Sequence, residues 1–98
     1  MKPLEYHPAS QAESREAVDW YWSRSPVAAL DFADELKSAL ARLREAPLIC
    51  APYLHNTRRA LLDRFPYSVV FRERLHDIQI LAVAHAKRRP GYWVTRLK

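Results

Sequence analysis

One apolar stripe between two prolines constrains the fold of this chain more than any other feature. Between Pro26 and Pro47, apolar residues recur every three or four positions, the period of one face of an α-helix. Ser25 before Pro26 is a favourable N-cap followed by proline at the first helical position, and Pro47 ends the helix. The remaining positions are mostly charged, so we interpret the stripe as core rather than as a cofactor site. Its members are Ala29, Phe32, Ala33, Leu36, Ala39, Leu40 and Leu43.

A second helix is predicted just before this one, from Pro8 to about Arg24, after a short extended start at residues 4–7. Its apolar residues Ala9, Ala12, Ala17, Trp20 and Tyr21 fall near one face. Because only Ser25 separates the two helices, we expect a hairpin whose stripe packs with Ala17 and Tyr21 against a sheet. Glu13 lies on the same face, and we expect it to pair with an arginine from residues 58–64, since unpaired charges are rarely buried.

Three strands are predicted in the second half of the chain, after a loop at residues 47–57. They span Ala60–Phe65, Tyr67–Glu73 and Ile78–His85. The middle strand alternates in a way that suits a face partly open to solvent, and both faces of the last strand are largely apolar, which favours a central position. In the last strand we expect Ile78, Ile80, Ala82 and Ala84 to point one way and Gln79, Leu81, Val83 and His85 the other. The predicted fold is α+β, in the order β-α-α-β-β-β.

Length and composition exclude several classes of protein. The 98 residues correspond to one domain, residues 1–98, and a single glycine excludes Gly-rich phosphate loops. No apolar run reaches the roughly 20 residues of a membrane span, and no signal pattern is present, so we expect a cytoplasmic protein without membrane contact. Cys50, the one cysteine, indicates a reducing compartment and a small buried side chain. His7, His55 and His76 are too far apart in sequence to suggest a metal site, and we expect no cofactor.

Positive charge is concentrated in the second half of the chain. Residues 1–50 carry 6 basic and 8 acidic residues, a net charge of −2, whereas residues 51–98 carry 10 and 3, a net charge of +7. The densest cluster is Lys87-Arg88-Arg89, followed by Pro90-Gly91, which should turn these side chains outward, and by Tyr92-Trp93. Such a surface favours an acidic partner or a phosphate backbone. A plain nucleic-acid binder is the least favoured interpretation, because the predicted strands lack the aromatic pairs of stacking platforms.

Taken together and in their order along the chain, several short segments resemble the RelE/ParE superfamily of bacterial toxins. The resemblance spans Leu4 to Trp93, and five stretches carry it: Ala17-Val18-Asp19-Trp20-Tyr21, Ala29-Leu30-Asp31-Phe32, Arg58-Arg59, Arg64 to Phe71, and Ile80 to His85 running into Arg88, Arg89, Pro90, Tyr92 and Trp93. It favours the ParE-like branch, and so implies a helical hairpin on a small, mainly antiparallel sheet. It also implies a toxin of a type II toxin–antitoxin module that inhibits DNA gyrase by binding and is neutralised by a cognate antitoxin.

The resemblance also suggests roles for single residues. Target contacts are expected from Lys87, Arg88, Arg89, Tyr92 and Trp93. A ParD-like antitoxin with an acidic, amphipathic C-terminal segment is expected to contact Arg58, Arg59 and Arg64. Both groups have a structural alternative: the three arginines as ion-pair partners of helix acids, and the two aromatic residues as packing that holds the tail.

The rival hypothesis is a RelE-like endoribonuclease that cuts mRNA on the ribosome without a metal. That reaction needs a base, cations around the phosphate and an acid. Its candidate residues are His85, Arg72, Arg88 and Tyr92. His85 has a structural alternative as a hydrogen-bonded histidine at the end of a strand.

Overall fold

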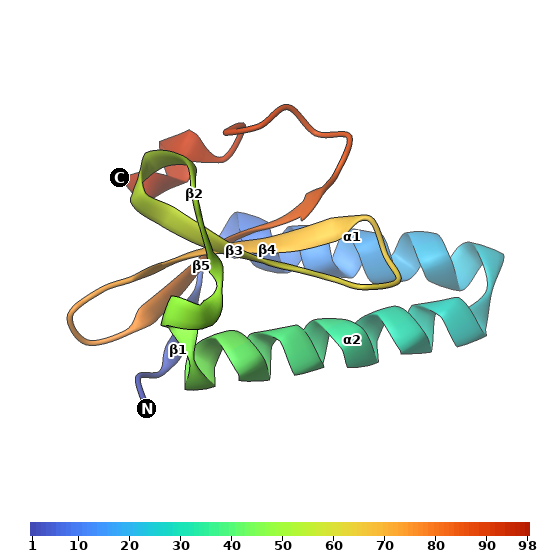
Figure 1. The fold of residues 1–98 in the computed structure, drawn as a ribbon. Helices are drawn as coiled ribbons and strands as arrows, with labels where there is room; N and C mark the ends of the chain where they lie inside the picture. Colours follow the sequence, from blue (N-terminus) through green and yellow to red (C-terminus); the bar gives the residue numbers. More distant parts are fainter.

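Two helices, a five-stranded sheet and a C-terminal tail make up the computed structural model, which describes residues 1–98 (Figure 1). The elements are β1 (Leu4–Tyr6), α1 (Pro8–Arg24), α2 (Pro26–Glu45), β2 (Ala51–Tyr53), β3 (Thr57–Leu61), β4 (Tyr67–Glu73) and β5 (Ile78–His85). Short 3₁₀ turns, η1 (Pro47–Ile49) and η2 (Leu54–Asn56), flank β2, and a third, η3 (Val94–Leu97), ends the tail, residues 86–98. The α+β class is confirmed. Neither helix is long and apolar enough to cross a membrane.

The helical hairpin forms where the sequence predicts it, because each helix has its own cap. The His7 imidazole accepts a hydrogen bond from the Ala9 N–H, which caps α1. Ser25 serves both helices: its N–H donates to the Tyr21 carbonyl, and its hydroxyl accepts from the Ala28 N–H. The predicted stripe is confirmed except at Ala33, which is exposed, and at Leu40, which is half-buried. Its buried members are Ala29, Phe32, Leu36, Ala39 and Leu43.

The sheet has the strand order β1-β5-β4-β3-β2, and only β1, which is parallel to β5, departs from antiparallel pairing. The prediction of a loop over residues 47–57 is wrong, because Ala51–Tyr53 forms a strand that pairs with β3. The connecting turn has left-handed backbone at His55 (φ 56°) and Asn56 (φ 62°), as in a type I′ hairpin turn. These residues adopt that conformation less readily than glycine does, so the turn carries no strong sequence signal.

The first of the three predicted strands is shifted as well: β3 spans Thr57–Leu61 rather than Ala60–Phe65. Residues after Leu62 leave the sheet because the Glu35 carboxylate accepts hydrogen bonds from the N–H groups of Asp63 and Arg64. A helix side chain therefore takes the place of a strand partner for this segment.

A β-bulge in β5 reverses the expected faces of its second half. Val70 pairs with Ala82 and Phe71 with Ile80, so Leu81 is an extra residue. One extra residue turns every following side chain to the opposite face. Strict alternation up to His85 is therefore wrong beyond Leu81: Val83 packs on the helix side of the sheet, and Ala82 and Ala84 on the other side.

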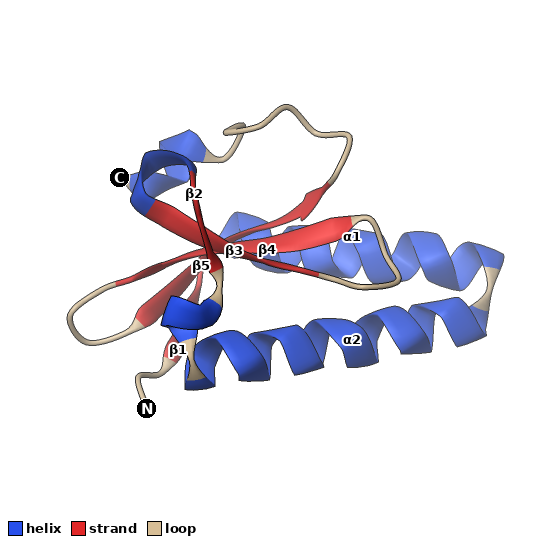
Figure 2. Ribbon diagram, viewed as in Figure 1, coloured by secondary structure: helices blue, strands red, loops and turns tan.

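Both faces of the sheet are covered (Figure 2). The helix-side core contains Phe32, Leu36 and Leu43 from α2, which pack with Ala17 and Tyr21 as expected against Val69, Phe71 and Ile80. The tail-side core consists of Val70, Leu81, Ala82, Ala84 and Trp93. The alternation of β4 predicted that its second face is partly open to solvent. This prediction is wrong, because the tail folds back over that face.

Candidate functional site: the C-terminal tail and its arginines

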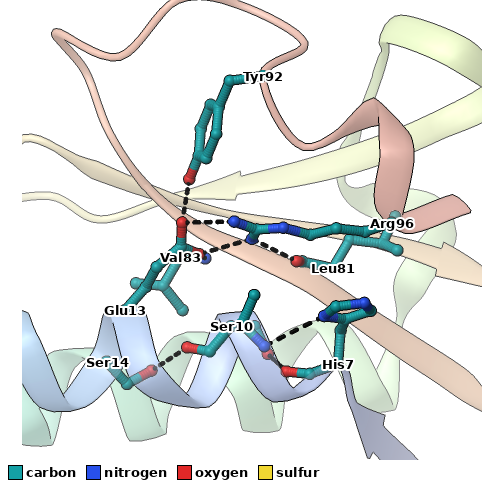
Figure 3. A network of polar contacts seen from close by, with 9 residues as sticks. His7, Ser10, Glu13, Ser14, Leu81, Val83, Tyr92 and Arg96 are labelled. Carbon is teal, nitrogen blue, oxygen red and sulfur yellow. Dashed lines mark hydrogen bonds and ion pairs between the residues drawn. The ribbon is translucent and has the colours of Figure 1, made fainter.

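One carboxylate, that of Glu13, joins the tail to α1 and β5 (Figure 3). Its Oε1 accepts hydrogen bonds from the Val83 N–H (3.0 Å) and Arg96 Nη1 (2.9 Å). Its Oε2 accepts from the Tyr92 hydroxyl (2.6 Å) and Arg96 Nη2 (3.1 Å). The side chains of Glu13 and Arg96 are only 12% and 15% exposed. Helix, strand and tail therefore meet at a nearly buried, fully paired charge.

This ion pair also completes the edge of the sheet. β1 ends at Tyr6, so beyond Ile80 the outer edge of β5 has no neighbouring strand. Its polar groups are bound by side chains instead: the Leu81 carbonyl accepts from Arg96 Nη1 (2.9 Å), and the Val83 N–H donates to Glu13. Glu13 and Arg96 thus replace a strand at an edge that would otherwise be open.

The prediction that Glu13 pairs with an arginine from residues 58–64 is wrong. The partner is Arg96, which lies 83 positions away in sequence and which no local pattern in the tail marks. The one signal of such a partner is Glu13 itself, a charge on an apolar helix face that needs a cation. Where the cation comes from depends on how the tail crosses the sheet.

Tyr92 is held as a hydrogen-bond donor. Burial, and then its hydrogen bond to Glu13, raise the pKa of Tyr92 far above the ordinary tyrosine value. The guanidinium of Arg88 lies 3.9 Å from the centre of the Tyr92 ring. Tyr92 therefore links the buried ion pair to the cations at the surface of the tail.

The three expected target-binding cations are exposed. A turn after β5 presents Lys87, Arg88 and Arg89: the Arg88 N–H donates to the His85 carbonyl (3.0 Å), and the Lys87 N–H donates to His85 Nδ1 (3.1 Å). None of the three forms an ion pair with a carboxylate. Trp93 differs from them, because it is 1% exposed and packs in the tail-side core. It holds the tail and offers no contact surface.

The proposed nuclease residues are only partly brought together. His85, Arg88 and Tyr92 all line two clefts beside the turn after β5, of about 550 Å³ towards α1 and about 280 Å³ towards β3. Arg72 is elsewhere. Tyr67 pairs with His85, and Arg72 lies five residues further along β4, roughly 16 Å away at about 3.3 Å per residue. Arg72 donates to Gln79 (2.8 Å) instead.

The three expected antitoxin-binding arginines do not form one cluster. Arg58 Nη1 donates to the Cys50 carbonyl (2.7 Å), and the Arg59 guanidinium lies 4.2 Å from the centre of the Tyr53 ring. Arg64 pairs with the helix acids Glu35 (3.1 Å) and Asp31 (3.8 Å). Arg64 therefore has the ion pair that its structural alternative describes, whereas Arg58 and Arg59 have no carboxylate partner.

The contacts of Glu35 predict a dependence of stability on pH. Burial alone would raise the pKa of Glu35, but hydrogen bonds from Arg64 and Asp63 outweigh it and hold the pKa below the ordinary value of 4.5. The carboxylate therefore stabilises the fold above that value, and the stabilisation is lost as pH falls through the folded-state pKa. We expect Glu35→Gln to lower the unfolding free energy by about 1 kcal/mol at neutral pH, with the difference vanishing in acid. Urea denaturation at several pH values measures this.

The matched control is Glu45→Gln, because Glu45 is exposed on the same helix and forms no ion pair. It should change stability by less than about 0.5 kcal/mol at every pH. A Glu35→Gln variant with the same pH profile as this control would contradict the assignment.

Comparisons with known proteins bear on the whole chain. A family profile described as "ParE toxin of type II toxin-antitoxin system, parDE" matches residues 4–90. A solved structure described as "Chromosomal ParDE TA system from P. aeruginosa" superposes with a TM-score of 0.77 at 23% sequence identity, over 89% of this chain and 98% of that chain. No curated protein matches the sequence. The structural likeness supports the fold, and the family match spans most of the chain.

Proposed function

The chain belongs to the ParE toxin family of type II toxin–antitoxin systems, and from this membership we propose that it inhibits DNA gyrase by binding, through its tail and without chemistry of its own. As the toxin of such a module it has a cognate antitoxin as its partner. In this proposal residues 1–98 act as one toxin domain in the cytoplasm, where gyrase works. The antitoxin is ParD-like and neutralises the toxin with an acidic, amphipathic C-terminal segment.

One observation carries the proposal: Lys87, Arg88 and Arg89 are exposed cations without carboxylate partners on a hydrogen-bonded turn. Below the turn, Tyr92 and Arg96 bind Glu13, and Trp93 is buried. A fixed basic surface attracts an acidic partner and orients it before contact. This arrangement suits a binding toxin.

Two further contacts argue against the nuclease alternative. Proton transfer at a phosphate needs its base, cations and acid within reach of one substrate. Arg72 lies far along β4 from His85 and binds Gln79. The Tyr92 hydroxyl donates to Glu13, and its raised pKa leaves it firmly protonated. Two of the four candidate residues are therefore engaged in structural contacts.

Replacing Arg88 and Arg89 by alanine tests the proposal. We expect the double variant to inhibit gyrase supercoiling about tenfold less or worse, because binding energy concentrates in a few residues of an interface. Its stability should fall by no more than about 1 kcal/mol, the value of an exposed cation–π contact such as that of Arg88 on Tyr92. Supercoiling assays with purified proteins, together with thermal melts, measure both effects.

The matched control is Arg15→Ala with Lys37→Ala, which removes the same charge from exposed helix positions. It should inhibit gyrase as the wild type does. Equal inhibition by both double variants would show that the tail is not the gyrase-binding surface.

His85→Gln separates the binding toxin from the nuclease. The amide keeps a polar side chain but cannot exchange protons near pH 7. We expect this variant to fold and to remain toxic, because the glutamine side-chain oxygen can still accept from the Lys87 N–H, which His85 Nδ1 binds in the wild type. A folded but harmless variant, together with cleavage of ribosome-bound mRNA by the wild type, would overturn the gyrase proposal.

A further inference from the structure

The connection between α2 and β2 exposes two neighbouring apolar side chains. Leu48 is 72% exposed and Ile49 is 85% exposed. Their backbone is hydrogen-bonded: the Ile49 N–H donates to the Ala46 carbonyl, the Cys50 N–H donates to the Pro47 carbonyl, and the Cys50 carbonyl accepts from Arg58. The two side chains therefore face solvent from a hydrogen-bonded turn. Large adjacent apolar side chains in such a position are typical of a binding surface.

Unpaired cations lie beside this turn. Arg58 Nη1 donates to the Cys50 carbonyl (2.7 Å), and Arg42 is exposed in the last turn of α2, where its carbonyl accepts from the Ala46 N–H (3.0 Å). Neither arginine has a carboxylate partner, and Arg44 donates only to the Lys2 carbonyl (2.9 Å). Glu45 is the one acid in the last turn of α2. We call Leu48, Ile49, Arg42 and Arg58 the η1 patch.

The η1 patch lies beside an open sheet edge. β2 is the last strand of the sheet, and its outer side has no partner. It has only three residues, and its central one is Pro52, which has no N–H to donate. A long added strand is thus disfavoured, and a partner at this edge must be held by side chains.

From these features we propose that the η1 patch is the site where the antitoxin's acidic, amphipathic segment docks, with Leu48 and Ile49 as its apolar anchor points. The inference rests on the proposed function, which supplies the antitoxin. Charge complementarity selects this occupant: acidic groups of the segment meet Arg42 and Arg58 while its apolar face covers the two exposed side chains. A second copy of this basic chain would bring like charges together.

The η1 patch is separate from the tail. It follows α2 on the helix side of the sheet, whereas the tail covers the opposite face (Figure 1). The antitoxin thus holds the toxin by a surface other than the one proposed to contact gyrase. Variants of one surface should leave binding at the other intact.

Calorimetry tests the docking site. The probe is the protein encoded by the reading frame next to the toxin gene, titrated into the full toxin chain. We expect Leu48→Ser with Ile49→Ser to weaken binding about 30-fold or more, as at the centre of an interface, and to make the heat-capacity change less negative. Arg42→Gln should mainly lower the association rate and its dependence on salt, as measured by rapid mixing at two salt concentrations.

Leu75→Ser is the matched control. Leu75 is 80% exposed in the β4–β5 turn, but its neighbour Arg74 already pairs with Asp77 (2.6 Å). This control, and Arg88→Ala with Arg89→Ala, should bind the antitoxin within about twofold of the wild type, because their substitutions lie outside the docking site. If the serine double variant does not fold, Ile49→Ser alone, at the more exposed position, should still weaken binding about fivefold.

The outcomes separate the two proposals. A wild-type chain that does not bind the neighbouring gene's product would overturn the antitoxin assignment itself, and the docking site with it. Normal binding by the folded serine double variant would overturn the docking site alone. The docking site would also be overturned if the serine double variant sedimented differently from the wild type in the absence of antitoxin but bound the antitoxin normally. The patch would then be a contact between copies of this chain.

Discussion

Glu13→Gln is expected to lower the unfolding free energy by about 3–5 kcal/mol, because removing one partner of a buried ion pair leaves the other charge uncompensated. Here that charge is Arg96, whose side chain is 15% exposed. The substitution also weakens the acceptor that holds the Val83 N–H and the Tyr92 hydroxyl. Urea denaturation at neutral pH measures the loss.

Glu16→Gln is the control for this prediction. Glu16 lies one turn further along α1, is exposed and makes no hydrogen bond through its side chain. Its replacement should change stability by less than about 0.5 kcal/mol. In a double-mutant cycle, Glu13→Gln combined with Arg96→Met should cost less than the sum of the single changes, because the unpaired charge is gone. Strict additivity would mean that Glu13 and Arg96 do not interact.

Trp93→Ala should likewise cost about 3–5 kcal/mol, the range for removing a large buried aromatic side chain. Trp93 is 1% exposed and packs on Val70, Leu81 and Ala84. Its ring also lies 6.1 Å from that of Tyr53. No other aromatic side chain is fully buried on this face, so the neighbours can fill the cavity only in part.

Trp22→Ala is the matched control, because Trp22 is 56% exposed on α1. It should change the unfolding free energy by about 0.5 kcal/mol or less, measured in the same denaturant. If the two tryptophan variants were equally stable, the tail would not be docked on the sheet. A large loss of stability at Trp93 alone would also distinguish packing from target binding, because the unfolding free energy is measured without any partner.

The helices could be predicted from sequence because their signals are local. Ser25 and Pro26 mark a helix start whatever lies elsewhere in the chain, and Leu36 is buried because the three- or four-residue period places it on the apolar face. β4 and the ends of β5 follow in the same way from short-range alternation. The order of these elements also carried the family resemblance, which the profile match over residues 4–90 confirms.

Where local signals are weak or conflict, long-range contacts decided the structure. The turn at His55 and Asn56 has no glycine, so β2 was predicted as loop. The bulge at Leu81 cannot be read from β5 alone, because both of its faces are apolar and either register would bury them.

The candidate site depends most on tertiary structure. Its exposed cations Lys87, Arg88 and Arg89 were evident from charge density, but their support was not. That support comes from Glu13, Trp93 and Arg96, which meet only once the tail has crossed the second face of the sheet. Sequence periodicity determines which residues must be buried or paired. Only the packed fold decides which partners meet them, because contacts between distant segments form where the whole chain satisfies its apolar surface and its charges together.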